Sequence, residues 1–162
     1  MSKPRSPQRP DSGDADRQLN DPTALTRRHL RFGWWMLLLF LSLGLILEAF
    51  HALKASSYLS VANETRRLMW TLAHAHGTLL GLINIAFAFT IRAVPQWPAR
   101  SRNFASAFML GSAVLMPAGF FLGGINVRAG DPGLGILLLP VGGLMLFAAV
   151  LMTALGASKY RE

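Results

Sequence analysis

The sequence contains no cysteine. Disulfides, cysteine-ligated zinc, thiolate-ligated haem and cysteine-held iron–sulfur clusters are therefore excluded. Signature motifs of common enzyme classes are absent as well: there is no phosphate-binding loop, no zinc-protease helix and no nucleophile with an attached base. These absences favour a protein that is not an enzyme.

Charged residues are scarce within four long apolar stretches, at about residues 34–53, 70–94, 104–124 and 134–156. A helix needs ~20 residues to cross the ~30 Å hydrocarbon layer of a bilayer. Each stretch therefore predicts a transmembrane helix, and the short connections require neighbouring helices to run antiparallel. The predicted fold class is all-α: a polytopic membrane protein built as an antiparallel bundle of four transmembrane helices.

The rest of the chain is small. Residues 1–26 are rich in Pro, Ser, Asp and Arg, which predicts a disordered, basic and proline-rich cytoplasmic tail. Residues 27–158 form the predicted membrane domain, and residues 159–162 a short cytoplasmic C-terminus. No internal repeat indicates the two-fold design of many transporters.

A net charge of +8 would suggest a nucleic-acid partner in a soluble protein. In this chain, however, the basic residues gather beside the ends of the apolar stretches, so no nucleic acid is expected as a partner. Eight lie on one side of the predicted membrane and four on the other: Arg27, Arg28, Arg31, Arg92, Arg100, Arg102, Lys159 and Arg161 against Lys54, Arg66, Arg67 and Arg128. The positive-inside rule then places both termini in the cytoplasm, at a plasma or inner membrane.

One basic group precedes the first stretch. Arg27, Arg28 and Arg31 predict contact with anionic lipids of the inner leaflet, and His29 is interpreted as part of the same surface patch.

Small residues recur within the stretches. Gly77 and Gly81, and likewise Gly119 and Gly123, have the GxxxG spacing that lets membrane helices approach closely. The spacing is equally compatible with packing within the chain, with contact to other membrane subunits and with contact to a second copy of the chain. Asn84, in the middle of the second stretch, is expected to hydrogen-bond across the bundle.

Four polar residues are predicted to share one layer beneath the outer face: Glu48, His51, His74 and His76. Glu48 and His51 are three residues apart and share a helix face, as in the Glu-x-x-His motif of metal-binding bundles. His74 and His76 diverge by roughly 200° around a helix of ~3.6 residues per turn, so at most one of them joins the other two. The layer predicts either a mononuclear metal site from these four candidates or a haem site, with haem ligands from His51, His74 and His76.

Glu48 is the most informative member of this layer. On insertion scales an acidic side chain costs about 2.5 to 3.5 kcal/mol at the bilayer centre, and less near the interface. Two explanations remain open. Either a metal, a proton path or a histidinium neutralises the carboxylate, or the carboxylate pairs with Lys54, Arg66 or Arg67.

The segment Thr71-Leu-Ala-His74-Ala-His76-Gly77-Thr-Leu-Leu resembles the second helix of haem-copper oxidase large subunits. In that family an Ala-His-Gly segment near the outer end supplies a haem ligand. The resemblance implies a haem bound by His76. Because the third and fourth stretches contain no histidine, the second axial ligand would be His51 or come from another subunit.

Three functions follow as hypotheses. The first is a small haem- or metal-binding membrane subunit, with haem b or one divalent metal, working in electron transfer, sensing or cofactor handling. The second is a non-enzymatic structural or assembly subunit of a membrane complex. The third is a small proton-coupled transporter or channel, in which Glu48 and the histidines titrate at an outer gate.

Overall fold

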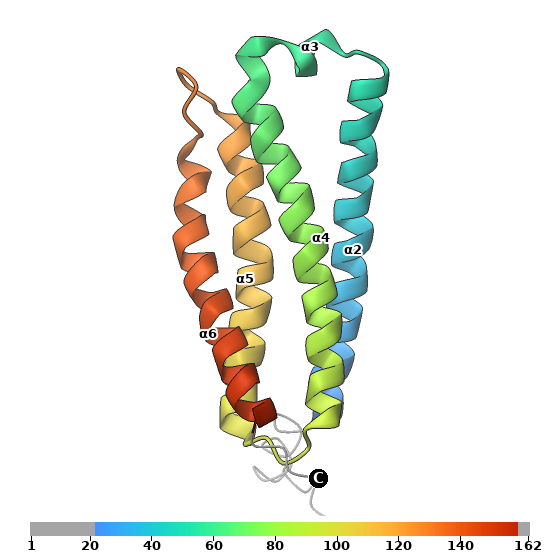
Figure 1. The fold of residues 1–162 in the computed structure, drawn as a ribbon, viewed down its shortest axis with the longest axis vertical. Coiled ribbons are helices and arrows are strands. Elements are labelled where there is room, and N and C mark those ends of the chain that lie inside the picture. Colours follow the sequence, from blue (N-terminus) through green and yellow to red (C-terminus); the bar gives the residue numbers. More distant parts are fainter. Residues whose placement is uncertain (1–21, 159–162) are drawn as a thin grey trace, which may run out of the picture.

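A computed structural model describes residues 22–158 of the chain, and these residues are almost entirely helical (Figure 1). The long helices are α2 (Pro22–Ala52), α4 (Glu64–Ala93), α5 (Ala99–Ile125) and α6 (Leu138–Ser158). Short helical turns connect them: α3 (Ser56–Leu59), η1 (Val61–Asn63) and η2 (Leu134–Leu137). The all-α fold class is confirmed, as is the prediction of four helices long and apolar enough to cross a membrane.

Helices α2, α4 and α5 begin before the predicted spans, whereas α6 begins later than its predicted span, at Leu138. Helix α2 begins at Pro22, a residue suited to the first helical turn because its φ is already fixed and its missing N–H would be unpaired there. Its 31 residues reach roughly 46 Å at ~1.5 Å per residue, more than the ~30 Å hydrocarbon layer. Residues 22–26, expected in the tail, are therefore helical, whereas residues 1–21 and 159–162 lie outside the described part.

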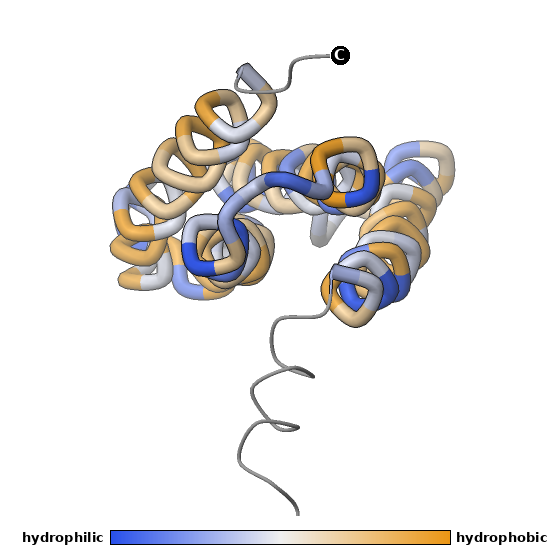
Figure 2. Tube along the Cα trace, turned by 90° about the horizontal axis from the view of Figure 1, so that it is seen from below, coloured by the Kyte–Doolittle hydropathy of each residue, from blue (hydrophilic) through white to orange (hydrophobic). Residues whose placement is uncertain are grey.

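Helices α4 and α5 form the central pair of the fold. Helix α2 packs along α4 and helix α6 packs along α5, whereas α2 and α6 lie on opposite sides and share no packed interface (Figure 2). In the most apolar part of each helix, 39% of the residues are buried in α4 and in α5, but only 28% in α2 and 11% in α6. The two flanking helices therefore turn most of their apolar surface outward.

Glycines set the contact between α2 and α4. The ring of Phe40 lies directly over Gly77, and the ring of His74 lies directly over Gly44. At Gly33 an added Cβ would stand only 2.8 Å from the carbonyl oxygen of Gly81, so the two backbones touch. Larger residues at these positions would push the helices apart.

The second GxxxG pair works in the same way between α5 and α6. A Cβ at Gly119 would lie 2.9 Å from Leu139, and one at Gly142 would lie 2.7 Å from Met116. Both GxxxG sequences therefore serve packing within the described chain. Gly143 differs, since a Cβ there would meet nothing within 4 Å.

We call the end of the bundle at the α2–α4 connection the outer end and the opposite end the inner end, after the orientation that the sequence predicts. Arg66 ties the outer ends of α4 and α5 together. Its Nε donates to the carbonyl oxygen of Gly124 at 3.1 Å, and Nη2 donates to that of Ile125 at 3.5 Å. These carbonyls belong to the last turn of α5, where no helical N–H is available to them. The guanidinium also lies 5.9 Å from the ring centroid of Trp70, which in turn stacks on Phe121.

Helix α2 ends in a Schellman motif. The N–H of Lys54 donates to the carbonyl of His51 at 3.1 Å, and the N–H of Ala55 donates to that of Phe50 at 3.0 Å. Lys54 has φ of 50°, a left-handed conformation in which glycine avoids the Cβ strain of other residues. This turn fixes where α2 stops and so fixes the position of His51.

We expect Lys54→Gly to raise the free energy of unfolding by about 0.5–1 kcal/mol, because it removes the left-handed strain at this cap. Thermal or denaturant unfolding of the detergent-purified protein measures the change. Gly130→Ala is the opposite change and serves as the matched comparison. Gly130 has φ of 88°, and an added Cβ there would meet no other atom within 4 Å. Alanine would therefore introduce backbone strain without a clash, and this variant should be less stable. A Lys54→Gly variant less stable than the wild type would contradict the left-handed conformation of Lys54 in the Schellman motif.

Candidate functional site

A groove lies between the outer halves of α2 and α4, and we call it the outer groove. Its volume is about 390 Å³, and it is lined by Leu41, Gly44, Leu45, Leu47, Glu48, His51, Thr71 and His74. Three of the four residues expected in the polar layer thus line one groove with an otherwise mostly apolar wall. His76 does not line it.

His74 forms the inner wall of the outer groove. Its ring rests on Gly44, and its Nδ1 donates a hydrogen bond of 2.6 Å to the carbonyl oxygen of Phe40 on α2. A carbonyl can only accept, so Nδ1 carries the proton in the neutral ring. The lone pair of the imidazole is then on Nε2, the atom through which histidine binds a metal or haem iron when Nδ1 is held this way.

His51 has the same arrangement at the end of α2. Its Nδ1 donates to the carbonyl oxygen of Leu47 on its own helix at 3.1 Å, which again leaves the lone pair on Nε2. The ring meets the buried Tyr58 edge-on, with 5.2 Å between ring centroids. The side chain is exposed, and its only hydrogen bond among residues 22–158 is to α2 itself.

Glu48 is exposed and has no hydrogen bond or ion pair with any residue in the described part. The suggestion that it pairs with nearby basic residues is wrong, because those side chains are used elsewhere. Arg66 binds the end of α5, and Arg67 donates to the carbonyl of Leu59 at 3.0 Å. Lys54 has no hydrogen bond or ion pair with Glu48 either. The carboxylate therefore lines the outer groove without a hydrogen-bond or ion-pair partner among residues 22–158.

His76 faces the opposite side of α4. Its ring lies against Phe120 of α5, with 4.6 Å between centroids, and its Nδ1 donates to the carbonyl of Leu72 at 2.9 Å. The expected divergence of His74 and His76 is confirmed. Within residues 22–158, no group of three or more His, Cys, Asp or Glu side chains lies close enough to hold a metal ion.

A second polar cluster lies at the inner end, and sequence reasoning missed its centre. His29 is fully buried, so its assignment to the surface patch is wrong. Its Nδ1 lies 2.7 Å from Oδ1 of Asn84 on α4, and its Nε2 lies 2.8 Å from Oγ of Ser106 on α5. Asn84 is also fully buried, and the prediction that it hydrogen-bonds across the bundle is confirmed.

We call this cluster the His29 network. The donor and the acceptor of each of its hydrogen bonds can be assigned consistently from one end to the other. Arg28 can only donate, and it donates to Oγ of Ser106 at 2.6 Å. At the other end, Nδ2 of Asn84 donates to the carbonyl of Leu80 at 2.8 Å, so its Oδ1 is the acceptor for Nδ1–H of His29. Nε2 of His29 then accepts from the Ser106 hydroxyl. The network joins α2, α4 and α5 with every polar atom in this chain of bonds paired.

The sequence did hold a signal for this network. The buried positions of α2 recur at helical spacing, with Leu25, His29, Gly33, Met36 and Leu37 on one stripe. A histidine on that stripe belongs to the packed face, whereas its charged neighbours in the sequence belong to the surface.

We expect His29→Ala to lower the free energy of unfolding by about 2–4 kcal/mol, since it opens a cavity and leaves Asn84 and Ser106 with unpaired buried groups. Thermal unfolding in detergent measures this loss. Ser42→Ala is the control, because the Ser42 hydroxyl bonds only the carbonyl of Leu38 on the exposed side of α2 and should change little. Equal stabilities of the two variants would show that the network contributes nothing.

Comparison of this chain with protein-family models, with curated proteins and with solved structures found no match in any of the three. The resemblance of residues 71–80 to haem-copper oxidase large subunits therefore stays a prediction. The function of the chain is inferred from its own geometry.

Proposed function

We propose that this chain is a small, non-enzymatic, multi-pass membrane subunit that holds an imidazole-ligated cofactor, haem b in preference to a lone divalent metal, in the outer groove. The observation that carries the proposal is the composition of that groove. Two histidines present lone pairs on Nε2, and an unpaired carboxylate lies beside them, all within an apolar wall. Ionisable groups at such a depth are expensive unless a ligand compensates them.

The donor set fits haem better than a bare ion. A zinc ion takes four donors in a structural site and three protein donors in a catalytic one. The described residues assemble no group of three such donors. Haem brings four nitrogens of its own and needs few donors from the protein, and His51 and His74 are the residues that would hold it. Bound haem would supply one-electron chemistry, and the chain's own residues would position it.

The orientation of the site follows from the charge of the helix ends. We infer that the four helices cross the membrane antiparallel, with both termini in the cytoplasm and the outer groove near the opposite face. Trp34 and Trp35 are consistent with this placement, since their side chains are 63% and 68% exposed at the start of the predicted span, well along α2 from Pro22. Exposed tryptophans of this kind gather at the membrane–water interface.

A structural or assembly subunit is the second candidate, and His74 favours it. This side chain already has a packing role, because its ring fills the space over Gly44 and its Nδ1 bonds the backbone of α2. In this alternative the outer histidines only join helices, and Glu48 faces the lipid headgroups. The proton-coupled transporter has less support, because α6 contains no charged residue that would continue a path across the membrane.

The reduced-minus-oxidised visible spectrum of the detergent-purified protein, produced with haem available, tests the first proposal. We expect bands of a b-type haem in the wild type and a loss of at least about tenfold in haem per protein in His51→Ala. His51 is the sharpest probe, because its side chain is exposed and its loss should leave the fold intact. His76→Ala is the matched control on the opposite face of α4 and should keep its haem.

Each other outcome has a definite meaning. A wild type without haem bands would overturn the cofactor proposal and leave the structural subunit. Loss of haem in His76→Ala but not in His51→Ala would also reject the outer groove, and would support the ligand implied by the oxidase resemblance instead.

A further inference from the structure

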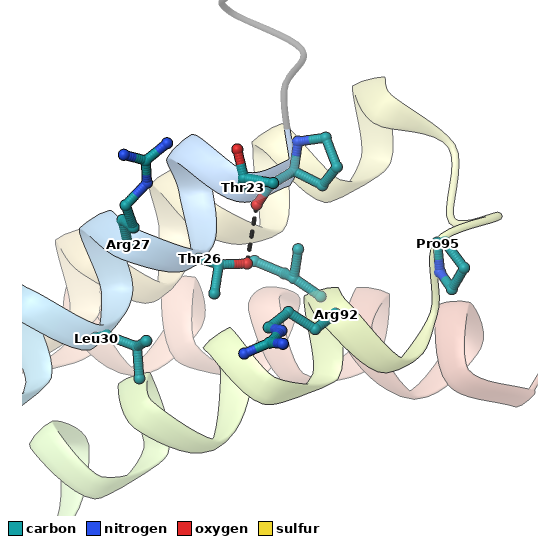
Figure 3. Close-up of a pocket in the computed structure, with 8 residues that line it drawn as sticks. Thr23, Thr26, Arg27, Leu30, Arg92 and Pro95 are labelled. Atoms are coloured by element: carbon teal, nitrogen blue, oxygen red, sulfur yellow. Dashed lines mark hydrogen bonds between the residues drawn. The ribbon is translucent and has the colours of Figure 1, made fainter.

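The inner ends of α2 and α4 enclose a second groove, which we call the inner groove. Its volume is about 400 Å³, and its lining includes Thr23, Arg27, Leu30, Ile91, Arg92 and Pro95 (Figure 3). It shares no residue with the outer groove, and it lies at the other end of the same pair of helices. We propose that the inner groove binds the phosphate headgroup of an anionic phospholipid. This inference is independent of the cofactor proposal but rests on the membrane placement proposed above.

Two guanidinium groups from different helices border the inner groove. Figure 3 shows Arg27 projecting from α2 and Arg92 from α4, with Thr26 between them in this view. Both side chains are exposed, and neither has a hydrogen bond or ion pair with any residue from 22 to 158. Arg28 differs, because it donates to Ser106 in the His29 network. Of the two adjacent arginines, only Arg27 keeps all its donors for a ligand.

No acidic side chain competes for these arginines in the described part. The lining of the inner groove contains neither Asp nor Glu. Within residues 22–158 the acidic residues are Glu48, Glu64 and Asp131, and all of them lie toward the outer ends of the helices. Guanidinium groups bind phosphate oxygens through paired, charge-assisted hydrogen bonds, so a phosphate is the ligand that fits this charge.

The depth of the groove favours a lipid as the source of that phosphate. Arg27 precedes Trp34 by two helical turns, or about 10 Å along α2 on the water side of the tryptophans. Tryptophans mark the edge of the hydrocarbon layer, so the groove lies at the level of the headgroups. Its floor is apolar: Ile91 is fully buried and Leu30 is half-buried. A lipid can place its phosphate at this arginine-lined rim and its glycerol and upper chain over the floor.

The test compares two double variants that remove the same charge at the same end of the protein. Arg27→Gln with Arg92→Gln removes the groove arginines, whereas Arg31→Gln with Arg100→Gln removes exposed arginines outside it. Native mass spectrometry of the detergent-purified protein, titrated with phosphatidylglycerol, phosphatidylcholine or inorganic phosphate, counts the bound molecules. The samples are prepared at about 0.3 M ammonium acetate, which screens diffuse attraction.

We expect the wild type to bind phosphatidylglycerol in preference to phosphatidylcholine, and the groove variant to lose about tenfold or more in that affinity. The control variant should change by less than about threefold under the same screening. Equal losses in the two variants would overturn the proposal in favour of diffuse surface attraction, and so would equal binding of the two lipids by the wild type. Inorganic phosphate that binds as tightly as phosphatidylglycerol would show a site for a soluble anion instead.

Thermal unfolding without added lipid checks that both variants fold, which we expect because none of the four side chains has a hydrogen bond or ion pair among residues 22–158. If the groove variant does not fold, Arg92→Lys replaces it. That variant keeps the charge but loses the paired hydrogen bonds of a guanidinium, and should still weaken phosphatidylglycerol binding. Unchanged binding in Arg92→Lys would overturn the role of Arg92.

Discussion

Helices in lipid gain nothing from burying apolar surface against one another, because lipid tails are as apolar as leucine. In the membrane placement proposed here, the fold therefore depends on close backbone contact and on hydrogen bonds between helices. Both occur along the α2–α4 interface, where Gly33, Gly44, Gly77 and Gly81 let the helices meet. Hydrogen bonds cross it at both ends, from His74 to the backbone of Phe40 at the outer end and between His29 and Asn84 at the inner end.

The same constraint explains how much of the fold the sequence could predict. Span-length apolar stretches and GxxxG spacing identified the helices and the residues at their contacts, because both depend on local composition. The arrangement of α4 and α5 as the central pair could not be read in this way. Helix α6 is the most apolar of the four and yet the least buried. Hydrophobicity in a membrane protein indicates contact with lipid as readily as contact with protein, so it does not order the helices.

The candidate site was predicted in part, for a related reason. Helical geometry separates His74 from His76 whatever surrounds them, and the structure places them on opposite faces of α4. The partners of Glu48 and His29 depended instead on contacts far apart in the sequence. Arg66 is near enough to Glu48 in the chain to suggest an ion pair, but it binds the carbonyls at the end of α5. His29 follows two arginines in the sequence and nevertheless points into the core, because its position on the helix, rather than the charge of its neighbours, decides which way it faces.

Polar groups that are paired and polar groups that are unpaired lie side by side at each end of α2. At the inner end the His29 network is closed, while the adjacent Arg27 and Arg92 have no partner in the described part. At the outer end His74 is bonded through one nitrogen only, and Glu48 beside it through none. Paired groups hold the helices in register, and that register fixes where the unpaired groups stand. A ligand at either groove would therefore meet a site whose walls are already positioned by the packing, so little ordering of the backbone would oppose its binding.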